Sequence, residues 1–222
     1  MKITQLFPNV YHVHLPTKTE AVNTFLVFQE FYESPELKGK LSSIQEYETW
    51  LKLKMDKDLS FYIEEWSNGY NLPSEVLDHF YDASESLTPQ AKELLEQFRP
   101  RRGQKFYIIG TNEENLEPST FMHEVAHALF YTNEAYRSKV LQVLGEIKDT
   151  EKQKVLDYFT KTNVYHTDVF IDELHAYVID KDALAEEGVD VSGLTEAHDK
   201  LLDVFKEYCP IPLEVIVLPI AA

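Results

Sequence analysis

Two histidines and a glutamate form the pattern with the clearest chemical meaning in the chain. The segment reads His123-Glu124-Val125-Ala126-His127, inside a stretch with helical periodicity. Residues four apart lie one above the other on a helix, so both imidazoles can reach one metal ion. Glu124 can then approach a metal-bound water from the side. In this HExxH arrangement the two histidines bind zinc and the glutamate is the general base.

The residues around the motif favour a metal site over a pair of ordinary buried histidines. They are uncharged, namely Met122, Val125, Ala126, Ala128, Leu129 and Phe130. A His-Glu-His set on such an apolar helix is costly to bury unless its members are paired or hold a metal. We therefore expect His123 and His127 to be zinc ligands and Glu124 to be the catalytic base.

The third zinc ligand must come from another segment, because a catalytic zinc site usually has three protein ligands and a water. The longer form of the motif has a third histidine six residues after the second, with an intervening glycine. Phe130 and Asn133 stand at those two positions instead. We expect the third ligand to be Glu173, in a helix predicted over residues 167–180.

Three polar residues interrupt the otherwise apolar segment 169–179, and they need an explanation. They are Asp172, Glu173 and His175. The helix face of Glu173 also carries His166, Phe170 and Tyr177. Ala176 is small enough to let this helix approach the HExxH helix closely. Asp172 or His175 could bind the metal instead, with Glu173 in a supporting role.

The two motifs together resemble the gluzincin branch of the zinc metallopeptidases. The resemblance rests on His123-Glu124-Val125-Ala126-His127 and on Glu173-Leu174-His175-Ala176, and it extends over about residues 105–180. It implies that His123, His127 and Glu173 bind zinc and that Glu124 activates a water. It also implies a zincin-like mixed sheet whose edge strand, over residues 105–110, lines the substrate cleft.

One position departs from the best-known gluzincins, and the first part of the chain adds nothing to the resemblance. Those enzymes often carry an aspartate four residues after the ligand glutamate, where this chain has Tyr177. Residues 1–104 resemble no family that we can name.

The expected reaction is hydrolysis of a peptide bond. Zinc lowers the pKa of its bound water towards 7, and Glu124 accepts the proton and later delivers it to the leaving amine. A further donor usually stabilises the oxyanion. Tyr177 and His175 are candidates because they flank Glu173, with Tyr131 and Tyr165 behind them. The alternative is a non-catalytic binding or interaction domain that keeps the zinc and cleaves nothing.

The charge balance limits the possible partners. Lys+Arg 21 against Asp+Glu 38 gives a net charge of −17, and nucleic-acid surfaces need clustered Lys and Arg. We expect a peptide or protein substrate and no nucleic acid, and an acidic peptide would be a poor partner. The single cysteine, Cys209, and the absence of a signal-like apolar run favour a soluble cytoplasmic protein, with non-classical export as the alternative. The oligomeric state has no sequence signal.

Hydrophobic periodicity predicts an α+β protein with a strand-rich N-terminal extension. The composition changes near Gln104, which suggests an N-terminal region over residues 1–104 and a metal-binding catalytic region over 105–222, although a single domain is equally compatible. Strands are expected at residues 11–15, 24–28, 61–63, 105–110 and 212–218. Helices are expected at residues 42–54, 89–98, 119–131, 134–147, 151–159, 167–180 and 195–208. His12 and His14 fall on one side of a predicted strand, where we expect an exposed pair.

Overall fold

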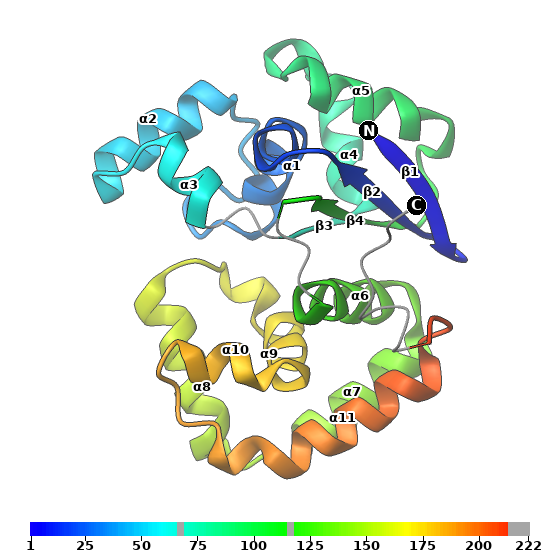
Figure 1. Ribbon diagram of the computed structural model, residues 1–222, viewed down its shortest axis with the longest axis vertical. Coiled ribbons are helices and arrows are strands. Elements are labelled where there is room, and N and C mark those ends of the chain that lie inside the picture. Colours follow the sequence, from blue (N-terminus) through cyan, green and yellow to red (C-terminus); the bar gives the residue numbers. More distant parts are fainter. Residues whose placement is uncertain (66–68, 115–117, 213–222) are drawn as a thin grey trace. The chain divides into compact units, whose positions relative to one another are not determined.

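The protein is α+β, as predicted, and its chain forms two compact units (Figure 1). The computed structural model describes residues 1–65, 69–114 and 118–212. The first unit is Met1–Leu116 and the second is Glu117–Ala222. This division falls after the strand that we had placed in the catalytic region, so it differs from the boundary expected near Gln104.

A four-stranded mixed sheet organises the first unit. Its strands are β1 (Lys2–Phe7), β2 (Val10–Leu15), β3 (Tyr70–Pro73) and β4 (Tyr107–Asn112). The spatial order is β1-β2-β4-β3, with β2 parallel to β4 and the other two pairs antiparallel. The strand at 105–110 was therefore predicted near its true place, but it is central and not at an edge. It belongs to the N-terminal unit because both of its pairing partners lie there.

The described part of the first unit is not strand-rich, because five α-helices accompany its short strands. They are α1 (Lys18–Glu33), α2 (Ile44–Met55), α3 (Leu59–Glu65), α4 (Ser74–Phe80) and α5 (Pro89–Phe98). Short 3-10 turns follow α4 at Ser84–Ser86 and α5 at Arg99–Arg101. The predictions of α2 and of α5, which starts with Pro89 after the Thr88 cap, are confirmed.

Two of the predicted strands are helical. Residues 24–28 lie inside α1, where Thr17 caps the helix by accepting a hydrogen bond from the Glu20 N–H. All five are buried, so an unbroken apolar run suits a covered helix as well as a strand. Residues 61–63 lie in α3, where the Asp58 carboxylate accepts a hydrogen bond from the Phe61 N–H at 3.0 Å. A local cap of this kind favours the helical turn.

Helix α1 packs so closely on β4 that only glycine fits at position 110. A β-carbon there would lie 2.6 Å from Cζ of Phe25, whose ring is buried and stacked on Tyr70 at a centroid distance of 5.1 Å. The ring has no room to move aside, since tightly packed cores resist added volume.

We expect Gly110→Ala to lower the free energy of unfolding by about 1–3 kcal/mol, the usual cost of overpacking. Urea denaturation measures this loss. The matched control is Gly145→Ala, at a helical site where an added β-carbon meets no described atom within 4 Å. That variant should be neutral or more stable, since alanine is the better helix former. Equal losses in both variants would refute the packing argument.

His12 is not exposed as expected, because β2 lies inside the sheet. Its side chain is 2% exposed, and Nε2 lies 2.7 Å from the Thr111 hydroxyl, which also lies 3.1 Å from Nδ1 of His14. Burial, with smaller contributions from the charges of His14 and Lys2, lowers the pKa of His12 to about 4. The imidazole is therefore neutral in the folded protein at pH 6, where the unfolded chain is partly protonated.

This shift predicts that the first unit loses stability in acid. Because the folded pKa lies below the unfolded value, the unfolded state binds more protons between pH 6.5 and about 4. The loss attributable to His12 should reach up to roughly 3 kcal/mol across that window. Urea denaturation at pH 7 and pH 4 should show a smaller difference for His12→Gln than for the parent. A His12 resonance that titrates near pH 6.5 in the folded protein would contradict the prediction.

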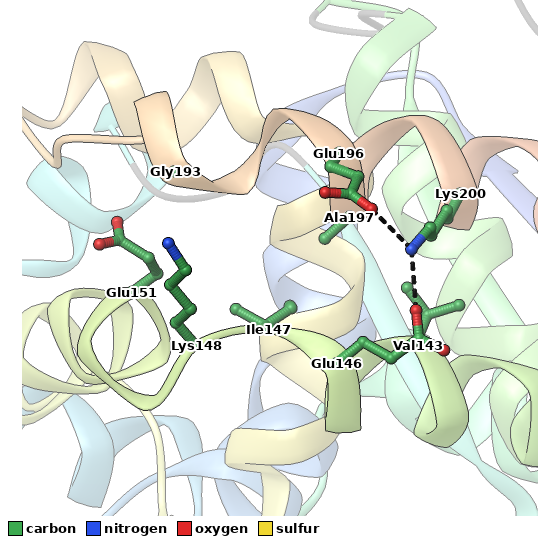
Figure 2. A pocket seen from close by; sticks show the side chains of 9 residues that line it. All are labelled: Val143, Glu146, Ile147, Lys148, Glu151, Gly193, Glu196, Ala197 and Lys200. Carbon is green, nitrogen blue, oxygen red and sulfur yellow. Dashed lines mark hydrogen bonds and ion pairs between the residues drawn. The ribbon is translucent and has the colours of Figure 1, made fainter.

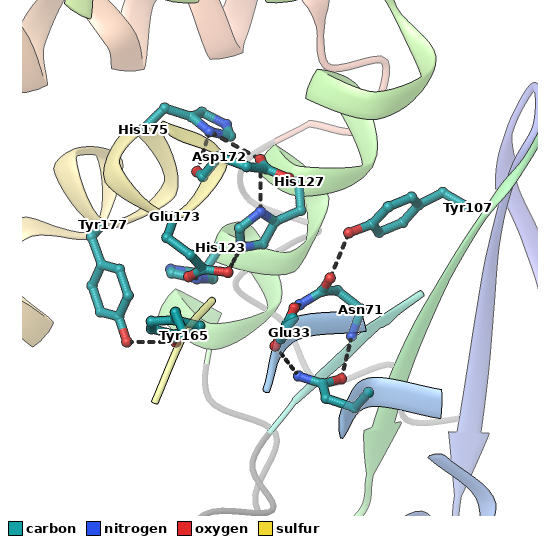
Figure 3. A network of polar contacts seen from close by, with 11 residues as sticks. Glu33, Asn71, Tyr107, His123, His127, Tyr165, Asp172, Glu173, His175 and Tyr177 are labelled. Atoms are coloured by element: carbon teal, nitrogen blue, oxygen red, sulfur yellow. Dashed lines mark hydrogen bonds and ion pairs between the residues drawn. The ribbon is translucent and has the colours of Figure 1, made fainter. Parts of the chain in front are cut away.

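A buried polar network joins α1 to β3 and β4, as the right-hand group in Figure 3 shows. The Asn71 amide donates to the Glu33 carboxylate at 2.7 Å, and the Tyr107 hydroxyl donates to the Asn71 side-chain oxygen at 2.7 Å. Gln29 also donates to Glu33, at 2.8 Å. The carboxylate thus has two side-chain donors, which is what a buried charge requires.

The described residues of the second unit form helices and the turns that connect them, without a strand. Its α-helices are α6 (Pro118–Thr132), α7 (Glu134–Glu146), α8 (Asp149–Thr162), α9 (Phe170–Ile179), α10 (Lys181–Glu186) and α11 (Thr195–Tyr208). Short 3-10 turns precede α9 (Thr167–Val169) and α11 (Ser192–Leu194). The predicted helices in this region are confirmed within a few residues at each end, and the side chain of Asn133 caps α7.

Two further observations complete the fold. The strand predicted at 212–218 lies, apart from Pro212, outside the described residues. Among the helices that the structure describes, none combines the length and apolar character needed to cross a bilayer.

Candidate metal centre

Helix α6 presents the HExxH motif on a buried surface. The helix begins with Pro118, whose fixed φ and missing N–H suit a first helical turn. Ser119 and Thr120 therefore lie within that first turn. The residues from Glu124 to Phe130 are all buried. Such surroundings make each polar group of the motif costly unless it has a partner.

Helix α9 lies beside α6 and brings the second motif to the first (Figure 3). Ala176 is fully buried, in keeping with the expected close approach of the two helices. On the face of α9 that carries Glu173, Phe159 of α8 contacts both Phe170 and Tyr177, with ring centroids 5.5 Å apart in each case. The side chain of Glu173 is thus held between packed helices.

Glu173 faces both histidines of the motif. Its Oε2 lies 3.8 Å from Nε2 of His123, and its Oε1 lies 3.6 Å from Nε2 of His127. These atoms are too far apart for good hydrogen bonds. Zinc bonds of about 2.0–2.2 Å place tetrahedral ligand atoms about 3.3–3.6 Å apart, close to the observed spacing. The three residues predicted as ligands are therefore brought together in an arrangement that could hold one ion.

The polar atoms of this group lack other partners. Nε2 of His127 and Oε2 of Glu173 are buried and form no hydrogen bond to any described residue. The side chains of His127 and Glu173 are only 1% and 2% exposed, whereas His123 is 13% exposed. Leaving such atoms unsatisfied costs about 1–3 kcal/mol each, and more where a group is charged. A cation between them would satisfy the group, and His123 marks its accessible side.

Asp172 forms a hydrogen bond with Nδ1 of His127, the ring nitrogen that does not face Glu173. Its Oδ1 lies 2.9 Å from Nδ1 of His127, so Nδ1 donates and Nε2 is left to face Glu173. Burial disfavours ionisation of Asp172, but the charge and hydrogen bond of His127 outweigh it, and the pKa of Asp172 stays below its usual range. Burial also opposes protonation of His127, yet Asp172 and Glu173 raise the pKa of His127 well above its usual value. The site attracts positive charge.

Asp172 was considered as a metal ligand, and the structure gives it a different contact. A second group of possible ligands, His127, Asp172 and His175, lies on the Nδ1 side of His127. There, however, the imidazole and the carboxylate already satisfy each other. On the Nε2 side two atoms that face each other, His127 Nε2 and a carboxylate oxygen of Glu173, lack a hydrogen bond, which favours the group that contains Glu173. Asp172 and Glu173 are neighbours in the helix, so their side chains reach opposite sides of one ring.

Glu124 lies beside the two histidines, buried on α6. Its Oε2 has no hydrogen-bond partner among the described residues. Burial raises the pKa of Glu124, and the nearby charges of His123 and His127 offset part of that rise. A carboxylate with a raised pKa is a better proton acceptor in the reaction, as a general base requires.

Tyr177 contacts the accessible ligand. Its ring meets the ring of His123 edge to face, with centroids 4.8 Å apart. Its hydroxyl lies 3.1 Å from the hydroxyl of Tyr165, as Figure 3 shows. Tyr177 therefore borders the site where the motif is exposed, which is compatible with a donor to a substrate.

His175 does not fit the role of a donor to substrate. It is fully buried, and its ring stacks on Phe130 with centroids 4.7 Å apart. It lies on the far side of Asp172 from His127, as Figure 3 shows. Helix geometry explains the error, because residues 173 and 175 differ by about 200° around the axis.

A separate hollow in the same unit lies between the ends of α7 and α11 (Figure 2). Its volume is about 200 Å³. Lys200 forms ion pairs there with Glu146 and Glu196, both at 2.8 Å. The described residues that line it include no member of the candidate centre.

Comparison with models of protein families gave no match, and neither did comparison with curated proteins or with solved structures. The function must therefore be inferred from the geometry of the site.

Proposed function

We propose that this protein is a zinc-dependent peptidase of the HExxH type, with His123, His127 and Glu173 as zinc ligands. One observation carries the proposal: two imidazoles and a buried carboxylate converge from two helices, and His127 Nε2 and Glu173 Oε2 form no hydrogen bond to any described residue. Two nitrogens and one oxygen form a donor set typical of catalytic zinc, which keeps a fourth position for water. Bound zinc supplies Lewis acidity and a water that ionises near neutral pH.

Each neighbouring residue then has a defined task. Glu124 takes the proton from the attacking water and returns it to the leaving amine. Its burial supports this role, because burial raises its pKa towards the working range. Tyr177, beside His123, donates a hydrogen bond to the oxygen that becomes negative during the reaction.

The net charge of the chain suggests a class of substrate but does not define the amino-acid sequence that is cleaved. The chain carries a net charge of −17, so a strongly acidic peptide would be repelled during its approach. We propose neutral or basic segments of peptides or proteins as substrates, within a soluble cytoplasmic setting.

A peptide library tests the activity. The protein loaded with zinc should cleave some members, lose cleavage on treatment with a chelator, and regain it when zinc is returned. Binding of one zinc per chain without cleavage would favour the non-catalytic zinc-stabilised domain. Cleavage that persists in chelator would refute the zinc mechanism.

A further inference from the structure

A third buried histidine lies behind the candidate zinc ligands. The His175 ring is stacked on Phe130 at an interplanar angle of 21°, and the Tyr136 ring lies 6.0 Å away at 73°. Placing an imidazole among aromatic rings costs free energy unless its nitrogens form hydrogen bonds. The contacts of His175 should therefore explain why a histidine is there.

The contacts of Nδ1 lead to Asp172. Nδ1 lies 2.5 Å from the carbonyl oxygen of Asp172 and 3.3 Å from its Oδ1. Both oxygens are acceptors, so the proton of His175 is on Nδ1. Nε2 is buried and has no hydrogen-bond partner among the described residues. The ring is thus oriented towards Asp172.

Asp172 in turn joins His175 to the zinc ligand His127. The same Oδ1 that His175 approaches accepts a hydrogen bond from Nδ1 of His127 at 2.9 Å. A carboxylate held by two imidazoles has less freedom to rotate than one held by a single partner. The result is a continuous chain from His175 through Asp172 to His127 (Figure 3).

We infer that His175 is a positioning residue, which acts through Asp172 to keep the proton of His127 on Nδ1 and its Nε2 free for the metal. The inference rests on the proposed function, since it assigns His127 Nε2 to zinc. The other tautomer of His127 would place a proton on Nε2, where it would block metal binding. Partners behind a ligating histidine typically change metal affinity by 10–100-fold.

Two substitutions at one position separate hydrogen bonding from packing. His175→Leu fills the space without a donor, whereas His175→Asn keeps an amide near the place of Nδ1. We expect the leucine variant to bind Zn²⁺ about tenfold more weakly, at the lower end of the usual range. The asparagine variant should stay within about threefold of the parent, because its donor replaces the one at Nδ1. Competition with a zinc chelator measures both dissociation constants.

A second readout does not depend on zinc. Nitrogen-15 NMR of the zinc-free protein, in buffer alkaline enough for the His127 imidazole to be neutral, should show its proton on Nδ1 in the parent and in His175→Asn. In His175→Leu a mixture of tautomers should appear. If the leucine variant does not fold, His175→Gln takes its place, since its amide reaches the position of Nε2 and leaves Nδ1 unreplaced.

Phe130→Leu is the packing control, because it removes the stacking partner and keeps the polar chain. It should reduce the thermal stability and leave zinc affinity unchanged. Equal zinc affinity in the parent and His175→Leu, or equal losses in the leucine and asparagine variants, would overturn the inference. A parent protein that binds no zinc would refute the proposed function, and the tautomer measurement would still decide the role of His175.

Discussion

Glu124→Gln should retain zinc and lose hydrolysis. Glutamine has nearly the same shape as glutamate, so His123, His127 and Glu173 keep their places and the zinc affinity should change by no more than a few-fold. The amide cannot accept the proton of the attacking water. General-base catalysis is worth about 10²–10⁴-fold, so kcat should fall at least about 100-fold with little change in KM.

Metal analysis and steady-state cleavage of one peptide from the library measure these two effects separately. Glu134→Gln is the matched control, because Glu134 is an exposed glutamate at the start of α7. That variant should have the activity of the parent. A Glu124→Gln protein that cleaves as well as the parent would show that the proposed mechanism is wrong.

Glu173→Ala should abolish tight zinc binding. The carboxylate is 2% exposed and faces Nε2 of both histidines, so nothing among the described residues can replace it from the same direction. Loss of an outer partner alone costs 10–100-fold in affinity, so loss of a ligand should cost more than about 100-fold. Chelator competition measures the dissociation constant, and activity should fall with it.

Asp168→Ala is the control for this variant. Asp168 is an acidic residue of the turn before α9, and its side chain is 65% exposed. It should bind zinc as the parent does. If Glu173→Ala also binds zinc with the parent's affinity, the third ligand is another residue, and the group His127, Asp172 and His175 becomes the alternative.

The candidate site could be predicted from the sequence because each of its two motifs lies within one short segment of the chain. Two histidines four apart on one helix must share a face, whatever the rest of the chain does. The apolar character of residues 169–179 likewise marked Glu173 as an acid in need of a partner. The role of Asp172 could also have been found, since a neighbour of the ligand glutamate is well placed to reach the other nitrogen of the same imidazole.

The errors arose where tertiary structure decides between local alternatives. Residues 24–28 have the composition of a strand, but a buried helix accommodates the same residues, and they form part of α1. The central place of β4 depends on pairing with β2, about 100 residues earlier in the chain, which no local pattern reveals. The burial of His12 follows from that same pairing. His175 was assigned to the substrate side because it is near Glu173 in sequence, although it lies on another face of α9.

An anomalous difference map of zinc-loaded crystals, collected on both sides of the zinc absorption edge, tests the central claim most directly. The account predicts one peak in the second unit, within about 2.0–2.2 Å of His123 Nε2, His127 Nε2 and one oxygen of Glu173. A site without zinc in crystals soaked with the metal, with Glu173 turned away from both histidines, would contradict it.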